Sequence, residues 1–183
     1  MAYTSSKGFL YRGSMISPSE PVVQSFIIDN SKTITIGDAI TLAAGFATVS
    51  AGVGGDNIAG ICVGIVDASG IPVWQEGADV DGTLTGDDTY ASAADNQTDK
   101  KCKVQVVPTT TALWYNEADS TLAQAEEGLY FDLTNTGDQV TGTGNATKAT
   151  MQLVKMLSTA SGPNSFGEGL FKIAESYFQV AAA

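Results

Sequence analysis

The chain has 183 residues and a net charge of −11, because 20 acidic residues outnumber 9 basic ones. It contains no histidine, which excludes Ser-His-Asp and Cys-His catalysis and removes the commonest metal ligand. Such an acidic chain is unsuited to binding nucleic-acid phosphates. Hydrophobic residues make up 43% of the chain, which is enough for a packed core. We therefore expect a globular protein that binds no nucleic acid.

The first 21 residues mix Ser, Gly and Pro with isolated large apolar residues, and they show no helical or strand period. We predict that residues 1–21 form an extended N-terminal arm that a partner or a neighbouring copy covers. A frayed terminus without a role is an equal alternative. No continuous apolar segment occurs there, so we expect neither a signal peptide nor a membrane span. The residues expected to make the contact are Phe9, Leu10, Tyr11, Arg12, Met15 and Ile16.

From Val22 onward the sequence consists of short segments rich in β-branched residues and separated by turn residues. The segments "VVQSFIID", "TITIGDAITL", "GFATVS" and "IAGICVGIV" predict strands. The last of these is expected to be buried and curved, because Gly60 and Gly64 lie within it. Residues 77–100 are polar and rich in Asp, which predicts a solvated loop or hairpin. Together these segments define an expected β-rich domain over residues 22–102.

Residues 103–183 form a second β-rich portion in this interpretation. Strand-like segments recur there at regular spacing: "KVQVVP", "TALWYN", "GLYFDLT", "ATMQLVKML" and "GLFKIAESYFQV". One short helix is expected in "NEADSTLAQAEEG", beginning at Asn116 or Ser120 and ending at Gly128. The predicted fold class is therefore all-β, a small β-barrel or β-sandwich, built as one unit or as two β-subdomains.

The stretch "DVDGTLTG" over residues 79–86 begins like the nucleophile motif of the haloacid dehalogenase phosphatases, with Asp79 as nucleophile and Asp81 as general acid. That site requires an apolar parallel strand before the motif, whereas "VWQEGA" precedes it here. A turn is the favoured interpretation, because Asp and Gly provide local hydrogen bonds and positive φ. An EF-hand loop fails, since Leu84 and Tyr90 occupy positions that require Gly and Glu. We expect no catalytic, cofactor-binding or metal-binding residues.

Several other side chains leave alternatives open. Cys62 is interpreted as a small buried hydrophobe, and a disulfide between Cys62 and Cys102 remains open. A weakly held cation in the acidic loop, near Asp79 and Asp81, is an alternative to simple solvation. The aromatic residues favour core packing or a subunit interface, with carbohydrate stacking as the alternative. That set comprises Trp74, Trp114, Tyr115, Tyr130, Phe131, Tyr177 and Phe178.

The stretch "TITIGDAITLAAGFATVSAGVGGDNIAGICVGIVDASG" resembles the decoration, or cement, proteins of tailed-phage capsids. The corresponding elements are residues 37–42, 46–49 and 58–64. The resemblance implies a non-enzymatic virion protein without cofactors, made in the host cytoplasm and bound to the major capsid protein on the capsid surface as a homotrimer. The N-terminal contact residues would then meet the capsid or another subunit. Two other classes stay open: a receptor- or glycan-binding surface module, and a small metal-dependent phosphatase using Asp79 and Asp81.

Overall fold

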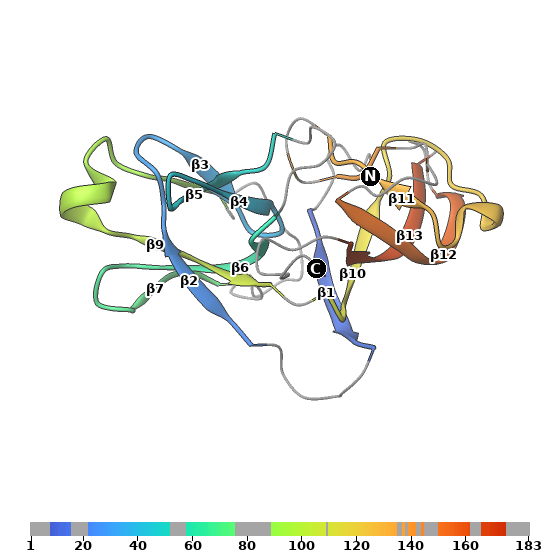
Figure 1. The fold of residues 1–183 in the computed structure, drawn as a ribbon, viewed down its shortest axis with the longest axis horizontal. Helices are drawn as coiled ribbons and strands as arrows, with labels where there is room; N and C mark the ends of the chain where they lie inside the picture. Colours follow the sequence, from blue (N-terminus) through green and yellow to red (C-terminus); the bar gives the residue numbers. More distant parts are fainter. Residues whose placement is uncertain are drawn as a thin grey trace, which may run out of the picture.

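The protein folds almost entirely into antiparallel β-sheets, which confirms the predicted all-β class (Figure 1). Within the part of the chain described by the computed structural model, the only helical segments are the π-helical turn η1 (Asn96–Lys100) and the 3-10 turn η2 (Gln124–Glu126). Two larger sheets form a sandwich-like arrangement. The described residues are 8–15, 22–51, 58–75, 89–108, 110–134, 137, 139–141, 144, 150–161 and 166–174.

The first sheet, here called sheet A, has five strands in the order β1-β10-β13-β12-β11. Its longest strands alternate between buried and partly exposed residues, as expected for a sheet with one face on the core. The strands are β1 (Leu10–Ser14), β10 (Ala112–Glu117), β11 (Tyr130–Phe131), β12 (Met151–Ser161) and β13 (Phe166–Ile173).

The second sheet, called sheet B, follows the order β2-β9-β6-β4-β5, and β7 also pairs with β6. Its central strand β6 is buried along nearly its whole length, because both faces of the sheet are covered. A parallel bridge between Ile28 and Ala47 brings β2 and β5 together, so the sheet curls toward a barrel. The strands are β2 (Gln24–Ile27), β4 (Ala39–Ala43), β5 (Phe46–Val49), β6 (Gly60–Val66), β7 (Pro72–Gln75) and β9 (Lys103–Val107).

One hydrophobic cluster lies inside the curl of sheet B and is called the aliphatic core. A small third sheet, β3 (Thr33–Thr35) with β8 (Thr89–Ala91), supplies Ile34 and the half-buried Tyr90 to it. Because its members are β-branched or small, they pack closely on the pleated surface of the sheet. They are Ile28, Ile34, Ile36, Ile40, Ala47, Cys62, Ile65, Val104 and Val106.

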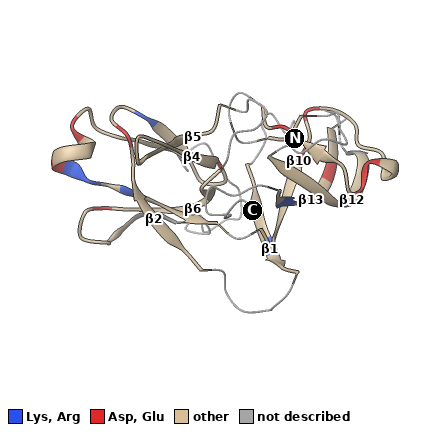
Figure 2. Ribbon diagram, in the orientation of Figure 1, with Lys and Arg blue, Asp and Glu red and all other residues tan. Residues whose placement is uncertain are grey.

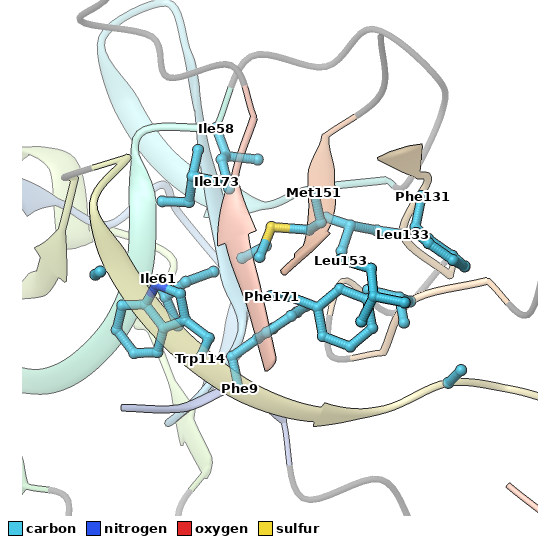
Figure 3. Close-up of a cluster of buried hydrophobic side chains, with 14 of the residues drawn as sticks. Phe9, Ile58, Ile61, Trp114, Phe131, Leu133, Met151, Leu153, Phe171 and Ile173 are labelled. Atoms are coloured by element: carbon cyan, nitrogen blue, oxygen red, sulfur yellow. The ribbon is translucent and has the colours of Figure 1, made fainter. Parts of the chain in front are cut away.

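A second cluster, the aromatic core, lies between the inner face of sheet A and the other face of sheet B (Figure 3). Its large side chains meet edge to face: the ring centroids of Phe131 and Phe171 are 5.7 Å apart, and those of Tyr11 and Trp114 are 5.5 Å apart. Edge-to-face pairs of this kind add stabilisation beyond the buried area. Sheet B contributes Ala39, Ile58, Ile61 and Val107.

The N-terminal residues differ from the extended arm predicted for residues 1–21. Residues 10–14 form β1, which pairs antiparallel with β10 at the edge of sheet A. Phe9 is 1% exposed and belongs to the aromatic core. The physical reason is that β10 offers an unpaired edge, and a strand that fills it gains backbone hydrogen bonds and buries its apolar side chains. Neither gain is visible as a period in so short a segment.

The two sheets also do not divide the chain at residues 102 and 103, where the sequence analysis divided it. Strand β9 follows that boundary yet pairs with β2 and β6 of sheet B, and β1 from the N-terminus joins sheet A. The expected helix is reduced to η2, and Asn116 lies within β10, where Trp114 and Asn116 face the core. Tertiary pairing therefore overrides the local helical preference of that segment.

Candidate interaction surface

Two of the predicted contact residues point into the protein. The Phe9 amide donates a hydrogen bond to the Gly37 carbonyl at 2.9 Å, in the turn between β3 and β4. The buried Asn116 side chain donates to the Gly8 carbonyl at 3.1 Å. Tyr11 packs on Trp114. Residues 8–11 thus connect sheet A to the β3–β4 turn, and Phe9 and Tyr11 are not free to bind a partner.

Other predicted contact residues remain accessible. Leu10 pairs with Tyr115 and therefore shares its outward face, and Arg12 is exposed at a bulge in β1. Met15 is 52% exposed, directly after the strand. Ile16 lies outside the described residues. Of the predicted set, Leu10, Arg12 and Met15 can meet a partner, and the prediction that they contact a capsid or subunit remains a prediction.

The outward face of sheet A carries a charged and aromatic cluster that the sequence analysis missed. Glu117 on β10 lies directly opposite Glu168 on β13. The Arg12 guanidinium carbon lies 5.5 Å from the centroid of the Tyr115 ring, within range of a cation–π interaction. The alternation in "ALWYNE" and "FGEGLFKI" places these residues on one face, but only the register of β10 with β13 brings the two carboxylates together.

Tyr115 is the electrostatic centre of this cluster. Burial raises its pKa above the usual value, and the negative charges of Glu168 and Glu117 raise the pKa further. A hydrogen bond to Glu168 acts in the same direction, because it stabilises the protonated phenol, whereas Arg12 lowers the pKa. The neutral phenol and the Arg12 guanidinium therefore lie beside the two carboxylates, where like charges directly opposite each other would otherwise be unfavourable.

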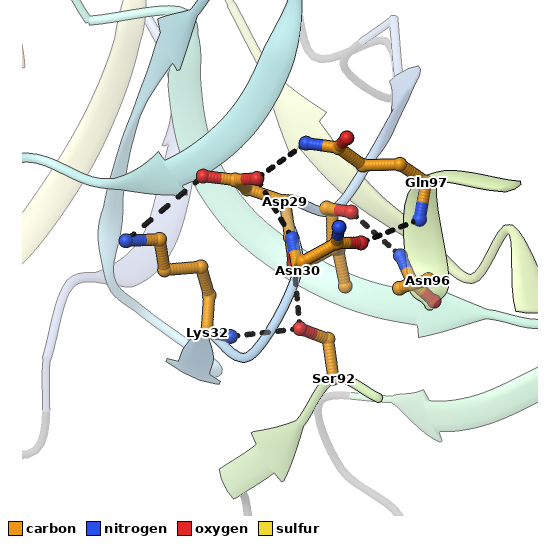
Figure 4. Close-up of polar contacts among 7 residues, drawn as sticks. Asp29, Asn30, Lys32, Ser92, Asn96 and Gln97 are labelled. Atoms are coloured by element: carbon orange, nitrogen blue, oxygen red, sulfur yellow. Dashed lines mark hydrogen bonds and ion pairs between the residues drawn. The ribbon is translucent and has the colours of Figure 1, made fainter. Parts of the chain in front are cut away.

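A second polar cluster closes the other end of the molecule and is called the latch (Figure 4). Asn96 of η1 is fully buried and donates to the carbonyls of Ile28 and Cys102, at 2.6 and 3.1 Å. Its side-chain oxygen accepts a hydrogen bond from the Cys102 amide. The Asp29 carboxylate accepts a bond from the Gln97 side chain at 2.5 Å. The latch fastens the end of β2 to the segment that leads into β9, and it has the character of a structural element.

The remaining candidates do not gather into a catalytic site. Asp79 and Asp81 lie outside the described residues, as do Tyr177 and Phe178. Trp114 and Phe131 are fully buried, so they belong to the core rather than to a sugar-stacking surface. Cys62 and Cys102 are both free thiols. Among the residues that the structure describes, no group of three His, Cys, Asp or Glu side chains is placed to hold a metal ion.

The described segments include no helix with the length and apolar character needed to cross a membrane.

Comparison with known proteins gives one structural likeness. No family model and no curated protein matches the chain. The chain is similar to the crystal structure of the C-terminal fragment of gene product 12 from bacteriophage phi29, with 13% sequence identity and a TM-score of 0.42. The match covers 82% of this chain and 98% of that fragment. Similarity at this level does not establish a shared fold or function.

Proposed function

We propose that this protein is a non-enzymatic structural component of a phage virion, which decorates the capsid exterior and stabilises it by bridging capsomers. The observation that carries the proposal is the sequence resemblance over residues 37–64. Its three elements correspond to β4, β5 and β6, which are neighbours in sheet B. Thr41 pairs with Thr48 in the β4–β5 hairpin, and Ile40 pairs with Gly60 of β6. The resembling residues therefore make one continuous piece of the fold.

The chemistry of the chain supports a binding role. The absence of histidine removes the usual general base, and the net charge of −11 favours a partner with a basic surface. A protein bound across the joint between two capsomers adds buried area that internal pressure must also break. The resemblance implies three copies per assembly and the major capsid protein as partner, and both are part of the proposal.

Binding to capsids tests the proposal directly. Undecorated capsids of the phage that encodes this chain are mixed with the purified protein and pelleted. We expect the protein to co-sediment, and we expect Met15→Asp to weaken binding because Met15 is 52% exposed beside β1. Ile71→Asp is the matched control, since Ile71 is 63% exposed in the turn between β6 and β7.

Each alternative outcome has a distinct meaning. Protein that stays in the supernatant at micromolar concentration contradicts the decoration role. Equal loss of binding in both variants contradicts the assignment of the contact to the β1 side. Hydrolysis of a generic phosphate ester that disappears in Asp79→Asn indicates the phosphatase instead. Specific retention on a glycan array, without binding to capsids, indicates the receptor-binding class.

A further inference from the structure

The outward face of sheet A is ordered in rows that run across the strands. Glu117 and Glu168 form an acidic row at one end. The next row is mainly apolar, because Leu10 pairs with Tyr115 and Tyr115 pairs with Leu170. A third row contains Lys172, which pairs with Gln152 of β12. These outward side chains, unlike Phe171 and Trp114 on the inner face, are only partly buried.

The central strand β13 shows this order most simply. Glu168, Leu170 and Lys172 alternate with the inward-facing Gly169 and Phe171, so all three project from the same face. At about 3.3 Å per residue, Glu168 and Lys172 lie about 13 Å apart along the strand, with Leu170 midway between them. Figure 2 shows acidic and basic segments toward opposite ends of β13. The face therefore reads acid, apolar, base along one direction.

Such a face is complementary to itself. If a second copy lies on it with its strands reversed, Leu170 meets Leu170, and each Glu168 meets the Lys172 of the other copy. A twofold axis in the plane of the interface and perpendicular to β13 produces this arrangement. We propose that the outward face of sheet A is the contact between two copies of this chain, related by a twofold axis that passes beside Leu170.

A second copy fits this face better than a basic or an apolar partner. A uniformly basic partner would meet the acidic row but be repelled at Lys172, and an apolar partner would leave both charged rows without solvent or counter-charge. Arg12 and Lys155 lie on the flanking strands β1 and β12 and are exposed. Their long side chains can keep their charged groups in solvent at the rim of the contact.

The inference rests on the homo-oligomer part of the proposed function and is independent of capsid binding. It differs from the three copies implied by the resemblance, because a twofold contact gives a dimer. Measurement of mass in the absence of capsids separates the two statements. A trimer would overturn the twofold contact and leave the decoration role intact, whereas a dimer that does not bind capsids would do the reverse.

The first experiment measures the mass of the full chain by light scattering and sedimentation equilibrium over a concentration series at low salt. We expect a dimer for the wild type and for Ile71→Asp, and a monomer for Leu170→Asp. Glu168→Lys or Lys172→Glu alone should weaken dimerisation at least tenfold. The double exchange should recover most of the loss, because it restores both ion pairs across the axis. A monomeric wild type, or single and double exchanges that weaken the dimer equally, would overturn the proposal.

A second experiment remains informative if Leu170→Asp fails to fold. Leu170→Cys is made in a Cys102→Ser background, since Cys62 is buried and Cys102 is half-buried. Next to a twofold axis, the two new thiols should form a disulfide-linked dimer rapidly under mild oxidation. Ile71→Cys in the same background is the control for collisional cross-linking. Equal rates of cross-linking at the two positions would contradict the placement of the axis.

Discussion

The aliphatic and aromatic cores differ in how far apart in the chain their residues lie. The aliphatic core takes all its members from residues 28–106, and most follow one another in adjacent strands. The aromatic core draws on Phe9 at one end of the chain and Ile173 at the other. The first core is therefore closed by short connections, and the second forms only when both ends of the chain are in place. Its formation carries a larger loop-closure entropy.

The two cores are nevertheless joined through sheet B. Neighbouring residues of β4, Ala39 and Ile40, face the aromatic and the aliphatic core respectively. The same holds for Ile61 and Cys62 in β6. Because these strands separate and serve both clusters, loss of one core exposes one face of the sheet that supports the other. We therefore expect a single cooperative unfolding transition rather than two.

The largest expected effect comes from Phe9→Ala, which removes a fully buried ring from the aromatic core near the chain terminus. Truncation of a buried Phe destabilises by about 3–5 kcal/mol. We expect this loss in denaturant titration, with circular dichroism and tryptophan fluorescence reporting the same midpoint. Two separate midpoints would show that the cores unfold independently.

Leu10→Ala is the matched control for Phe9→Ala. Leu10 follows Phe9 and faces outward, so its truncation should cost about 1 kcal/mol or less in a protein kept monomeric by dilution. Equal effects at the two positions would contradict the inward placement of Phe9 and favour the free arm expected from the sequence.

The sequence alone predicts the region around the aliphatic core well. The alternating segments of β4, β5 and β6 lie where their β-branched residues indicated, because local pattern and burial agree there. It fails for β1, where five residues interrupted by Gly13 carry no readable period. It also misses the cluster of Glu117, Glu168 and Tyr115, because the partners of a carboxylate depend on strand register. Register is a long-range property, set when β10 pairs with β13.

The next effect concerns the latch that closes the aliphatic core. Asn96→Ala removes three hydrogen bonds and leaves the Ile28 carbonyl and the Cys102 amide without these partners. Because an unsatisfied buried group costs about 1–3 kcal/mol, we expect a loss of about 2–3 kcal/mol in thermal or chemical denaturation. Gln97→Ala, which removes a half-buried contact to Asp29, should cost about 1 kcal/mol. A larger effect for Gln97 would mean that the latch depends on Asp29 rather than on Asn96.

Gly37→Ala tests the joint between the N-terminal residues and sheet B. Gly37 has φ of 92°, and a Cβ atom there would lie 2.8 Å from the Phe9 nitrogen. Gly70 has φ of 82° with nothing within 4 Å of such an atom, so Gly70→Ala isolates the backbone strain, about 1–2 kcal/mol. We expect Gly37→Ala to lower the free energy of unfolding by more than Gly70→Ala does. Equal losses would show that the close approach of residues 8 and 9 is not needed.

The smallest effect is absent at neutral pH and concerns Tyr90, at the boundary of the aliphatic core. Burial, followed by a side-chain hydrogen bond with Cys102, raises the pKa of Tyr90 to about 12. In the unfolded chain a tyrosine has a pKa of about 10. Between these values the folded protein retains a proton that the unfolded chain has lost, so the free energy of unfolding falls as the pH rises from about 10 to about 12. Tyr90→Phe removes this dependence. In chemical denaturation from pH 8 to pH 12, the difference in unfolding free energy between wild type and Tyr90→Phe should stay constant to about pH 10. It should then shift against the wild type. Curves that stay parallel throughout would indicate that the Tyr90 phenol titrates alike in the folded and unfolded states.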